Sequence, residues 1–349
     1  MNDKKKKIIV VAVVSLLVIV AVVLCSTFLF KEVEEQEYKE EEKVPTEVIP
    51  EKKLNIIDVN SNTRSIAVMV NNHATARAYH SGLQDAYLVY EIIVEGGITR
   101  MLAVYKDADT SKIGSVRSAR HYFLDYALEN DAIYVHHGNS PQAYSDFSSL
   151  GINRIEINDS TSGWRDKSLG ISSEHTLFTN MEKLNSAINK KGLRSTSDKD
   201  TLLNYNVDEI DLSEMNGAKL ANNVSINYSG YASTSYVYDS ENKVYKRSVN
   251  GKAHVDYLTK KQYTAKNIIT YQVANSTISG DKKGRQNLNN VGSGEGYYIS
   301  NGYAVPIKWS KSSRSAQTVY TYLDGTEINV NDGNTYIQIQ PVGKKLVIE

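Results

Sequence analysis

The sequence predicts an α+β fold, in which a mixed-sheet α/β N-terminal domain precedes a mostly antiparallel β C-terminal domain. Between residues 60 and 200, runs of β-forming residues alternate irregularly with helical patterns. Beyond residue 215, short β-forming runs are separated by Asn-Gly and Asp-Gly pairs, which are strong hairpin signals. A chain of 349 residues is long enough for two domains and a tail. We therefore expect domains over residues 60–200 and 215–349, joined by a polar linker.

The N-terminus is expected to anchor the protein in a membrane. Four lysines, Lys4 to Lys7, precede an uncharged apolar run from Ile8 to Phe30, and about 20 apolar residues cross a bilayer as a helix. The basic residues before this run and the acidic stretch after it favour a cytoplasmic N-terminus and an extracytoplasmic body. We predict a signal anchor or transmembrane helix over residues 1–30, and hence a single-pass protein of the cell membrane.

The single cysteine, Cys25, lies inside this apolar run. The body therefore has no disulfide, no Cys-ligated zinc and no thiol nucleophile. Two roles for Cys25 stay open. It is either a small apolar residue of a membrane helix or the lipidated residue of a bacterial lipoprotein, although a lipoprotein signal would carry a small residue where Leu24 stands.

Residues 31–59 are expected to form a disordered, charged stalk. This stretch is rich in Glu and Lys, contains Pro45 and Pro50, and shows no repeating apolar face. It cannot bury enough apolar surface to order itself.

The N-terminal domain begins with strand patterns. Ser65–Asn71 is a short apolar run, and Ala86–Val94 and Ile98–Tyr105 are rich in β-branched and aromatic residues. The Glu95-Gly96-Gly97 turn between the last two predicts a hairpin. Both strands are nearly apolar throughout, which indicates that both faces are covered.

Helical signals follow the hairpin. Apolar residues at helical spacing predict a helix over Ser118–Asn130, followed by a strand over Ala132–His137. Ser140 as N-cap, with Pro141 at the first helical position, predicts a helix that reaches Leu150. A last helix is expected over Leu177–Lys191, with Gly192 ending it.

The C-terminal domain is expected to contain many strands and few helices. Gly292-Ser293-Gly294-Glu295-Gly296 is interpreted as a loop, because a nucleotide-binding fingerprint would need a helix after it. The predicted strands are Ser235–Tyr238, Lys243–Val249, Ala253–Tyr257, Asn267–Ala274, Gly296–Ser300, Tyr303–Trp309, Thr318–Tyr322 and Asn334–Gln340.

Several segments resemble a known family. Ser65–Asn72, Val89–Arg100, Ile113–Arg120 and Gly138–Tyr144 are similar to the N-terminal domain of YerB-like bacterial lipoproteins, a family of unknown function. Segments similar to its C-terminal domain are Tyr245–Ser248, Asn250–Asp256, Lys266–Ile269, Val291–Gly296, Trp309–Lys311, Asp324–Ile328 and Asp332–Ile337. The resemblance covers roughly residues 60 to 342 in order. It implies a two-domain extracytoplasmic protein of Gram-positive type bacteria and carries no established activity.

Arginines gather at the predicted start of the helix after the hairpin. Arg117 and Arg120 lie where the helix dipole favours anions, so a negative group should compensate them. The compensating group is either a carboxylate of the hairpin, Glu91 or Glu95, or a bound anion. Arg100 could join either arrangement. We expect an anion-binding site made of Arg100, Arg117, Arg120, Glu91 and Glu95.

Histidines are concentrated in the N-terminal domain. His136 and His137 point to opposite faces of a strand, so they cannot share a metal from regular geometry. His121 and Asp125 lie four residues apart on one helix flank and can touch. We expect a cleft lined by His121, Asp125, His136, His137 and Asn139, and we expect no metal and no cofactor.

Two classes of function follow. The balance of 40 basic and 40 acidic residues gives no argument for nucleic acid as a partner, and no Gly-x-Ser-x-Gly nucleophile elbow is present. The first class is a membrane-tethered protein that binds an anionic cell-wall polymer, a precursor or another envelope protein. The alternative is an enzyme that acts on phosphate-containing cell-wall precursors, with the arginines clamping a phosphate.

Overall fold

The computed structural model describes residues 2–36 and 53–349, which fall into two compact units, Met1–Glu51 and Lys52–Glu349. Most of the stalk predicted over residues 31–59 lies outside the described residues. At its two ends the prediction of disorder is wrong. Residues 31–36 continue a helix, and the backbone N–H of Asn55 donates to the Asp332 carboxylate at 2.8 Å.

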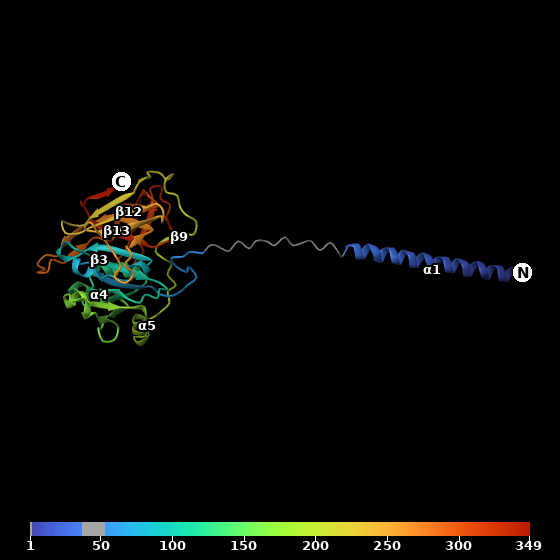
Figure 1. The fold of residues 1–349 in the computed structure, drawn as a ribbon, viewed down its shortest axis with the longest axis horizontal. Helices are drawn as coiled ribbons and strands as arrows, with labels where there is room; N and C mark the ends of the chain where they lie inside the picture. The colour runs from blue at the N-terminus through green and yellow to red at the C-terminus, as the bar shows by residue number, and fades with distance from the viewer. Residues whose placement is uncertain (1, 37–52) are drawn as a thin grey trace. The chain divides into compact units, whose positions relative to one another are not determined.

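The first unit contains the helix α1 (Asp3–Gln36), labelled in Figure 1. Its stretch Asp3–Leu29 contains an 18-residue window with a mean hydropathy of 3.5 and is long and apolar enough to cross a membrane. Cys25 is exposed on this helix.

The body is built on one large mixed sheet. Within the described residues this sheet has 11 strands in the order β10-β20-β19-β16-β23-β2-β3-β1-β5-β6, with β21 paired to β20. The strands are β10 (Lys219–Leu220), β20 (Tyr303–Lys311), β19 (Gly292–Ser300), β16 (Asn267–Val273), β23 (Thr335–Pro341), β2 (Leu88–Ile93), β3 (Thr99–Tyr105), β1 (Ile66–Asn71), β5 (Ile133–His136), β6 (Arg154–Glu156) and β21 (Val319–Tyr322).

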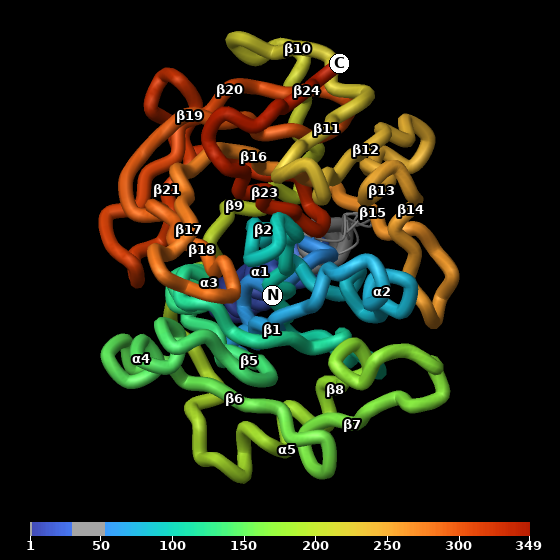
Figure 2. Tube along the Cα trace, turned by 90° about the vertical axis from the view of Figure 1, so that its left-hand side faces the viewer, coloured from blue at the N-terminus to red at the C-terminus, as the bar shows by residue number. Residues whose placement is uncertain are grey.

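The two halves of the sequence meet at the centre of this sheet. β23 runs parallel to β2, with Leu88 opposite Thr335, and also parallel to β16, with Asn267 opposite Thr335. Figure 2 shows β2 and β23 side by side in the middle of the body. Every residue of β1, β2, β3 and β23 is buried, as expected for strands covered on both faces.

A second sheet covers one face of the first. Its strands are antiparallel, in the order β14-β13-β12-β11-β24, with β15 paired to β13. In Figure 1, β12 and β13 lie on one side of β3, and α4 and α5 lie on the other. The strands are β14 (Lys252–Ala253), β13 (Val244–Val249), β12 (Ser233–Asp239), β11 (Asn223–Asn227), β24 (Leu346–Ile348) and β15 (Thr264–Ala265).

Helices and short strands complete the body. The helices are α2 (Ala74–Arg77), α3 (His121–Glu129), α4 (Pro141–Ser149) and α5 (Met181–Lys190), and the 3-10 turns are η1 (Leu83–Asp85), η2 (Glu95–Gly97), η3 (Lys167–Leu169) and η4 (Ser173–His175). The short strands are β4 (Ile113–Gly114), β7 (Trp164–Arg165), β8 (Leu177–Thr179), β9 (Asn204–Asn206), β17 (Asn275–Thr277), β18 (Gln286–Leu288) and β22 (Asn329–Asn331).

The predicted α+β class, the β2–β3 hairpin and the capped helix α4 are confirmed. The Ser140 hydroxyl accepts from the Ala143 N–H at 3.1 Å. The predicted helix over Leu177–Lys191 starts too early, because Leu177–Thr179 form β8 and the Asn180 side chain caps α5. Helix α3 likewise begins at His121 rather than Ser118, with Arg120 as its N-cap.

Two predictions for the C-terminal half are also wrong. The glycine-rich stretch from Gly292 to Gly296 is not a loop, because it pairs in antiparallel register with β20 from Lys311 to Ile307. The strand predicted over Ala253–Tyr257 ends at Ala253. His254, the next residue, is buried against the N-terminal half and donates to His80.

Candidate functional site

The candidate site lies where three strands end. β1, β5 and β6 are parallel neighbours, so their carboxyl ends share one edge of the sheet. Arg100, at the start of antiparallel β3, is opposite Asn71, the last residue of β1. The Arg117 N–H donates to the Met69 carbonyl at 2.9 Å. In open α/β sheets, ligands bind at this edge.

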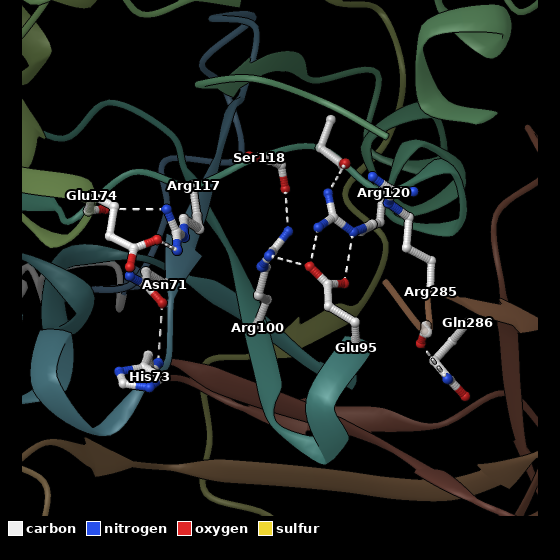
Figure 3. Close-up of polar contacts among 12 residues, drawn as sticks. Asn71, His73, Glu95, Arg100, Arg117, Ser118, Arg120, Glu174, Arg285 and Gln286 are labelled. Carbon is white, nitrogen blue, oxygen red and sulfur yellow. Dashed lines mark hydrogen bonds and ion pairs between the residues drawn. The ribbon is translucent and has the colours of Figure 1, made fainter. Parts of the chain in front are cut away.

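Arg100 and Arg120 share the carboxylate of Glu95 (Figure 3). Arg100 Nη2 donates to Glu95 Oε1 at 2.8 Å and Arg120 Nε donates to Oε2 at 2.8 Å. The side chains of Arg100 and Arg120 are only 6% and 7% exposed. Arg100 Nη1 also donates to the Ser118 carbonyl at 2.7 Å, and Arg120 Nη1 donates to the Ala119 carbonyl at 2.6 Å. Within the described residues, the buried Nε of Arg100 has no hydrogen-bond partner.

The charges of Arg100 and Arg120 favour the ionised form of the Glu95 carboxylate, the third member of this trio. Burial alone would raise the pKa of Glu95, but the hydrogen bond from Arg120 and the charges of both arginines lower it to about 2. Burial and the neighbouring Arg120 charge lower the pKa of Arg100 to about 10. Two cations therefore face one anion, and the trio keeps a surplus positive charge.

Arg117 lies beside this trio and has a different partner. Its Nη2 donates to Oε2 of Glu174 at 2.5 Å and its Nη1 to the Glu174 carbonyl at 3.3 Å. The two side chains are 23% and 54% exposed. The hydrogen bond from Arg117 lowers the pKa of Glu174. Arg117 is thus the most accessible arginine of the three predicted from the sequence.

Two histidines flank Arg117. The rings of His73 and His175 stack with their centroids 4.8 Å apart, and Asn71 Nδ2 donates to His175 Nδ1 at 2.9 Å. Because Nδ1 accepts, the proton of neutral His175 lies on Nε2. Burial lowers the pKa of His175, so this ring is neutral near pH 7.

A fourth arginine was not predicted. Figure 3 shows the side chain of Arg285 extending toward Arg120. Arg285 also donates to Asp281 at 2.8 Å. It comes from the turn between β17 and β18 of the C-terminal half, and only the fold brings this turn to α3. The local sequence carries no signal of that proximity.

Arg100, Arg117 and Arg120, with their partners Glu95 and Glu174, form an arginine cluster. Glu91 does not belong to this arginine cluster, so its predicted role is wrong. Glu91 is fully buried and pairs with Arg247 of β13 at 2.9 Å. It also accepts from Asn72 at 3.0 Å and Thr99 at 2.7 Å. The reason is geometric. Glu91 lies inside β2 and contacts the second sheet, whereas Glu95 lies beyond the strand in the turn η2.

The predicted contact between His121 and Asp125 is replaced by others. The Asp125 carboxylate accepts from Arg314 Nε at 2.7 Å and from Asn290 at 2.8 Å. Both partners come from the C-terminal half. Burial raises the pKa of Asp125 to about 6, and burial lowers the pKa of His121.

His136 and His137 have separate surroundings. His136 is fully buried, so it cannot line a cleft. It donates from Nδ1 to the Gly138 carbonyl at 2.9 Å and accepts from Arg154 at 3.2 Å. The half-buried His137 donates to the Ile157 carbonyl at 2.9 Å and accepts from Arg165 at 3.1 Å.

Asn139, the last predicted cleft residue, is half-buried and donates to the Ser140 carbonyl at 3.2 Å. No group of three or more His, Cys, Asp or Glu side chains within residues 2–36 and 53–349 is arranged to hold a metal ion.

The fold and these segments define a two-part family of unknown function. Residues 54–194 match the family described as "Protein of unknown function (DUF3048) N-terminal domain", and residues 224–337 match the corresponding C-terminal domain. The chain belongs to this DUF3048 family.

The YerB protein of Bacillus subtilis is similar to most of this chain in both sequence and structure. A Bacillus subtilis (strain 168) protein named "Putative lipoprotein YerB" is 30% identical over 285 residues, which cover 80% of this chain and 81% of the relative. The crystal structure of the YerB protein from Bacillus subtilis superposes with a TM-score of 0.70 at 27% identity, covering 82% of this chain and 94% of the other. Neither name carries an activity, so they do not support the alternative of an enzyme acting on cell-wall precursors.

Proposed function

We propose that this protein is a membrane-tethered, extracytoplasmic binding protein whose ligand is an anionic polymer of the cell envelope. The observation that carries the proposal is the pairing of Arg117 with an exposed carboxylate. Glu174 lies on the short turn η4 and is 54% exposed. A ligand phosphate can take the place of this carboxylate on the Arg117 guanidinium, because the two anions present similar oxygen acceptors.

The neighbouring charges support an anionic ligand. Arg100 and Arg120 share Glu95 and leave a surplus positive charge within the same cluster. Placing like charges side by side in a mostly buried position is costly, and a bound anion would offset that cost. An extended polymer suits the cluster better than a small molecule does, since Arg117 lies at the surface rather than in an enclosed pocket.

The tether supports an extracytoplasmic address. α1 is apolar enough to cross a membrane, and the relative YerB is named as a lipoprotein. We propose that α1 spans the membrane once with its N-terminus inside. Leu24 before Cys25 favours a membrane helix over lipidation, and mass spectrometry of the membrane-bound protein tests this by the presence or absence of an acyl group.

Substitution of Arg117 tests the binding proposal. Arg117→Ala in the full-length chain should weaken binding of poly(glycerol phosphate) by about tenfold or more, because a hydrogen bond to a charged group contributes about 1.5–3 kcal/mol. The melting temperature should stay nearly unchanged, because exposed ion pairs contribute about 0–1 kcal/mol. Calorimetric titration in detergent measures the first quantity and tryptophan fluorescence the second.

The matched control is Arg194→Ala. Arg194 is 50% exposed and pairs with Asp131, which precedes β5 and so lies at the opposite end of the strands. This variant removes the same charge and should bind the polymer like the wild type. Equal affinities for Arg117→Ala and Arg194→Ala, or a large loss of stability in Arg117→Ala without a change in affinity, would make Arg117 structural.

A further inference from the structure

We propose a second ligand site, a pocket between α2 and the β13–β14 hairpin that binds a small phosphorylated compound. The pocket has a volume of about 460 Å³, and its lining includes Arg77, Lys252, Lys260, His254 and Tyr257. Figure 2 shows α2 near β13 and β14, which come from the two halves of the sequence. The lining includes no residue of the arginine cluster, and the proposal does not depend on the function of that cluster.

Within residues 2–36 and 53–349, the cations of this pocket form no direct ion pair with a carboxylate, although the charge of Glu91 acts on Arg77 and partly offsets the lowering of its pKa by burial. Among the described residues, no ion pair or hydrogen bond involves the side chain of Arg77 or of Lys252, and the Lys260 ammonium lies 4.1 Å from the centroid of the Tyr257 ring. Arg77 is half-buried, and burial lowers its pKa. A half-buried guanidinium without an acceptor is unusual, because burial of a charge is costly unless the charge is paired.

The one carboxylate in the lining, Asp256, accepts hydrogen bonds on both of its oxygens. Asp256 Oδ1 accepts from the N–H groups of Leu258 at 2.8 Å and Thr259 at 2.9 Å. Its Oδ2 accepts from the Gly82 N–H at 2.9 Å and the Tyr263 hydroxyl at 2.8 Å. Asp256 therefore holds its own loop in place, and its single negative charge offsets only one of the three positive charges in the lining.

The floor of the pocket is a neutral histidine. Arg247 Nε can only donate, so His254 Nδ1 accepts from it at 3.1 Å. The proton of His254 must then lie on Nε2, which donates to His80 Nδ1 at 2.8 Å. His80 Nε2 in turn donates to the Asn71 carbonyl. Since both rings use both nitrogens, they add no charge. The positive charges in the lining are Arg77, Lys252 and Lys260, against the single negative charge of Asp256.

The chemistry of the lining selects the ligand. An arginine fork matches phosphate oxygens in a bidentate way, and lysines add point charges. Val249, Val255 and Ala74 supply an apolar wall beside these cations. The volume lies within the range of small-molecule sites, roughly 300–1,000 Å³. A phosphate monoester with an apolar body fits both parts of the pocket.

Titration with phenyl phosphate tests the site. The full-length protein in detergent should bind phenyl phosphate saturably in calorimetry, and about tenfold more tightly than inorganic phosphate, because the ring buries apolar surface. Arg77→Gln and the more exposed Lys252→Gln should each weaken phenyl phosphate by about tenfold or more. Arg194→Gln is the control and should leave the affinity unchanged.

Three results separate the outcomes. Absence of saturable binding to the wild type overturns the proposal, as does wild-type affinity in both Arg77→Gln and Lys252→Gln. Arg117→Ala should retain phenyl phosphate binding. If only Arg117→Ala lost phenyl phosphate binding, the phosphate would be placed at the arginine cluster and the pocket assignment would be overturned. If Arg117→Ala did not weaken polymer binding, the proposed function would fail but the phenyl phosphate result would still decide the pocket.

Discussion

The buried ion pair between Glu91 and Arg247 joins the two sheets at the level of single residues. Both side chains are almost inaccessible, at 1% and 0% exposed. Arg247 also donates to the Tyr236 hydroxyl at 3.0 Å and to His254 at 3.1 Å. Such a pair contributes little net stability over an apolar equivalent, but removal of one partner leaves a buried, uncompensated charge.

Arg247→Ala should therefore lower the free energy of unfolding by about 3–5 kcal/mol. Urea denaturation followed by tryptophan fluorescence measures the change. Adding Glu91→Gln to this variant should recover part of the loss, because the second substitution removes the stranded charge. Arg194→Ala, which breaks an exposed pair, should cost less than about 1 kcal/mol; a similar small cost for Arg247→Ala would contradict the argument.

Buried histidines make the stability depend on pH. Burial lowers the pKa of His80 to about 3, that of His136 to about 4, and that of His254 well below its usual value. Below about pH 6.5 these histidines bind protons in the unfolded chain but stay neutral in the folded protein. The free energy of unfolding therefore falls as the pH falls. Asp125 acts in the opposite sense, because burial raises its pKa to about 6.

The net slope should be about 2–3 kcal/mol per pH unit near pH 5, since each titrating group contributes at most about 1.4. Urea denaturation at pH 7.5, 6 and 5 measures it. The pKa of Glu95, lowered to about 2, adds a further loss only below about pH 4.5, the range in which the unfolded carboxylate takes up protons. A flat profile between pH 6.5 and 5 would show that the histidines are not buried as described.

The residues of the arginine cluster were partly predictable. Arg100, Arg120 and Glu95 lie within the hairpin and helix that the sequence indicated, so their proximity followed from local structure. Glu174, the partner of Arg117, lies on a turn more than fifty positions further along the chain. The contact of Glu174 with Arg117 depends on β7 and β8, which no apolar periodicity in the sequence predicted.

At the level of elements, strong local signals gave correct elements. The Ser140-Pro141 pair marks the start of α4. The start of α5 was predicted at Leu177 rather than Met181, because the Asn180 cap, which accepts from the Lys183 N–H at 2.9 Å, was missed. The β2–β3 hairpin followed from two apolar runs around a Gly-Gly turn. Very short strands such as β8 were missed, because three residues show no period that distinguishes a strand from the first turn of a helix.

The strand β19 shows the limit of turn signals. Gly292, Gly294 and Gly296 are poor strand formers, yet they pair with β20. Gly294 and Gly296 are required there for space. A Cβ at Gly294 would lie 2.7 Å from the Trp309 Nε1 atom, and one at Gly296 would lie 2.4 Å from the Thr270 carbonyl oxygen. Close approach of groups on the neighbouring strands, which the sequence does not reveal, requires glycine at these two positions.

At the scale of the whole molecule, the two family segments share one sheet. The division into domains at residues 60–200 and 215–349 stays a prediction, and β23 of the second segment lies between β2 of the first and β16. The buried core likewise contains residues of both segments, such as Val68 and Ile337. The pairing of β2 with β23 spans most of the chain, which is why the sequence did not predict it.

This shared sheet should make the body unfold in one cooperative step. The chain has two tryptophans, Trp164 in β7 and Trp309 in β20, and they report on different halves. Urea denaturation of the Trp164→Phe and Trp309→Phe variants can be followed by the fluorescence of the remaining tryptophan and by far-UV circular dichroism of the same sample. In each variant the fluorescence midpoint should coincide with the circular dichroism midpoint, which reports on the backbone. A fluorescence midpoint that differs from the backbone midpoint in either variant would mean that the halves unfold separately.

The central position of β23 also constrains the order of events during synthesis. The ribosome releases β2 long before Thr335 to Pro341 exist, so β2 remains with one hydrogen-bonding edge open and with mostly apolar side chains exposed. An open edge of this kind pairs readily with other chains, and contacts so distant in sequence form slowly. The nascent protein therefore cannot complete this sheet until residues 335–341 have been synthesised and can pair with β2.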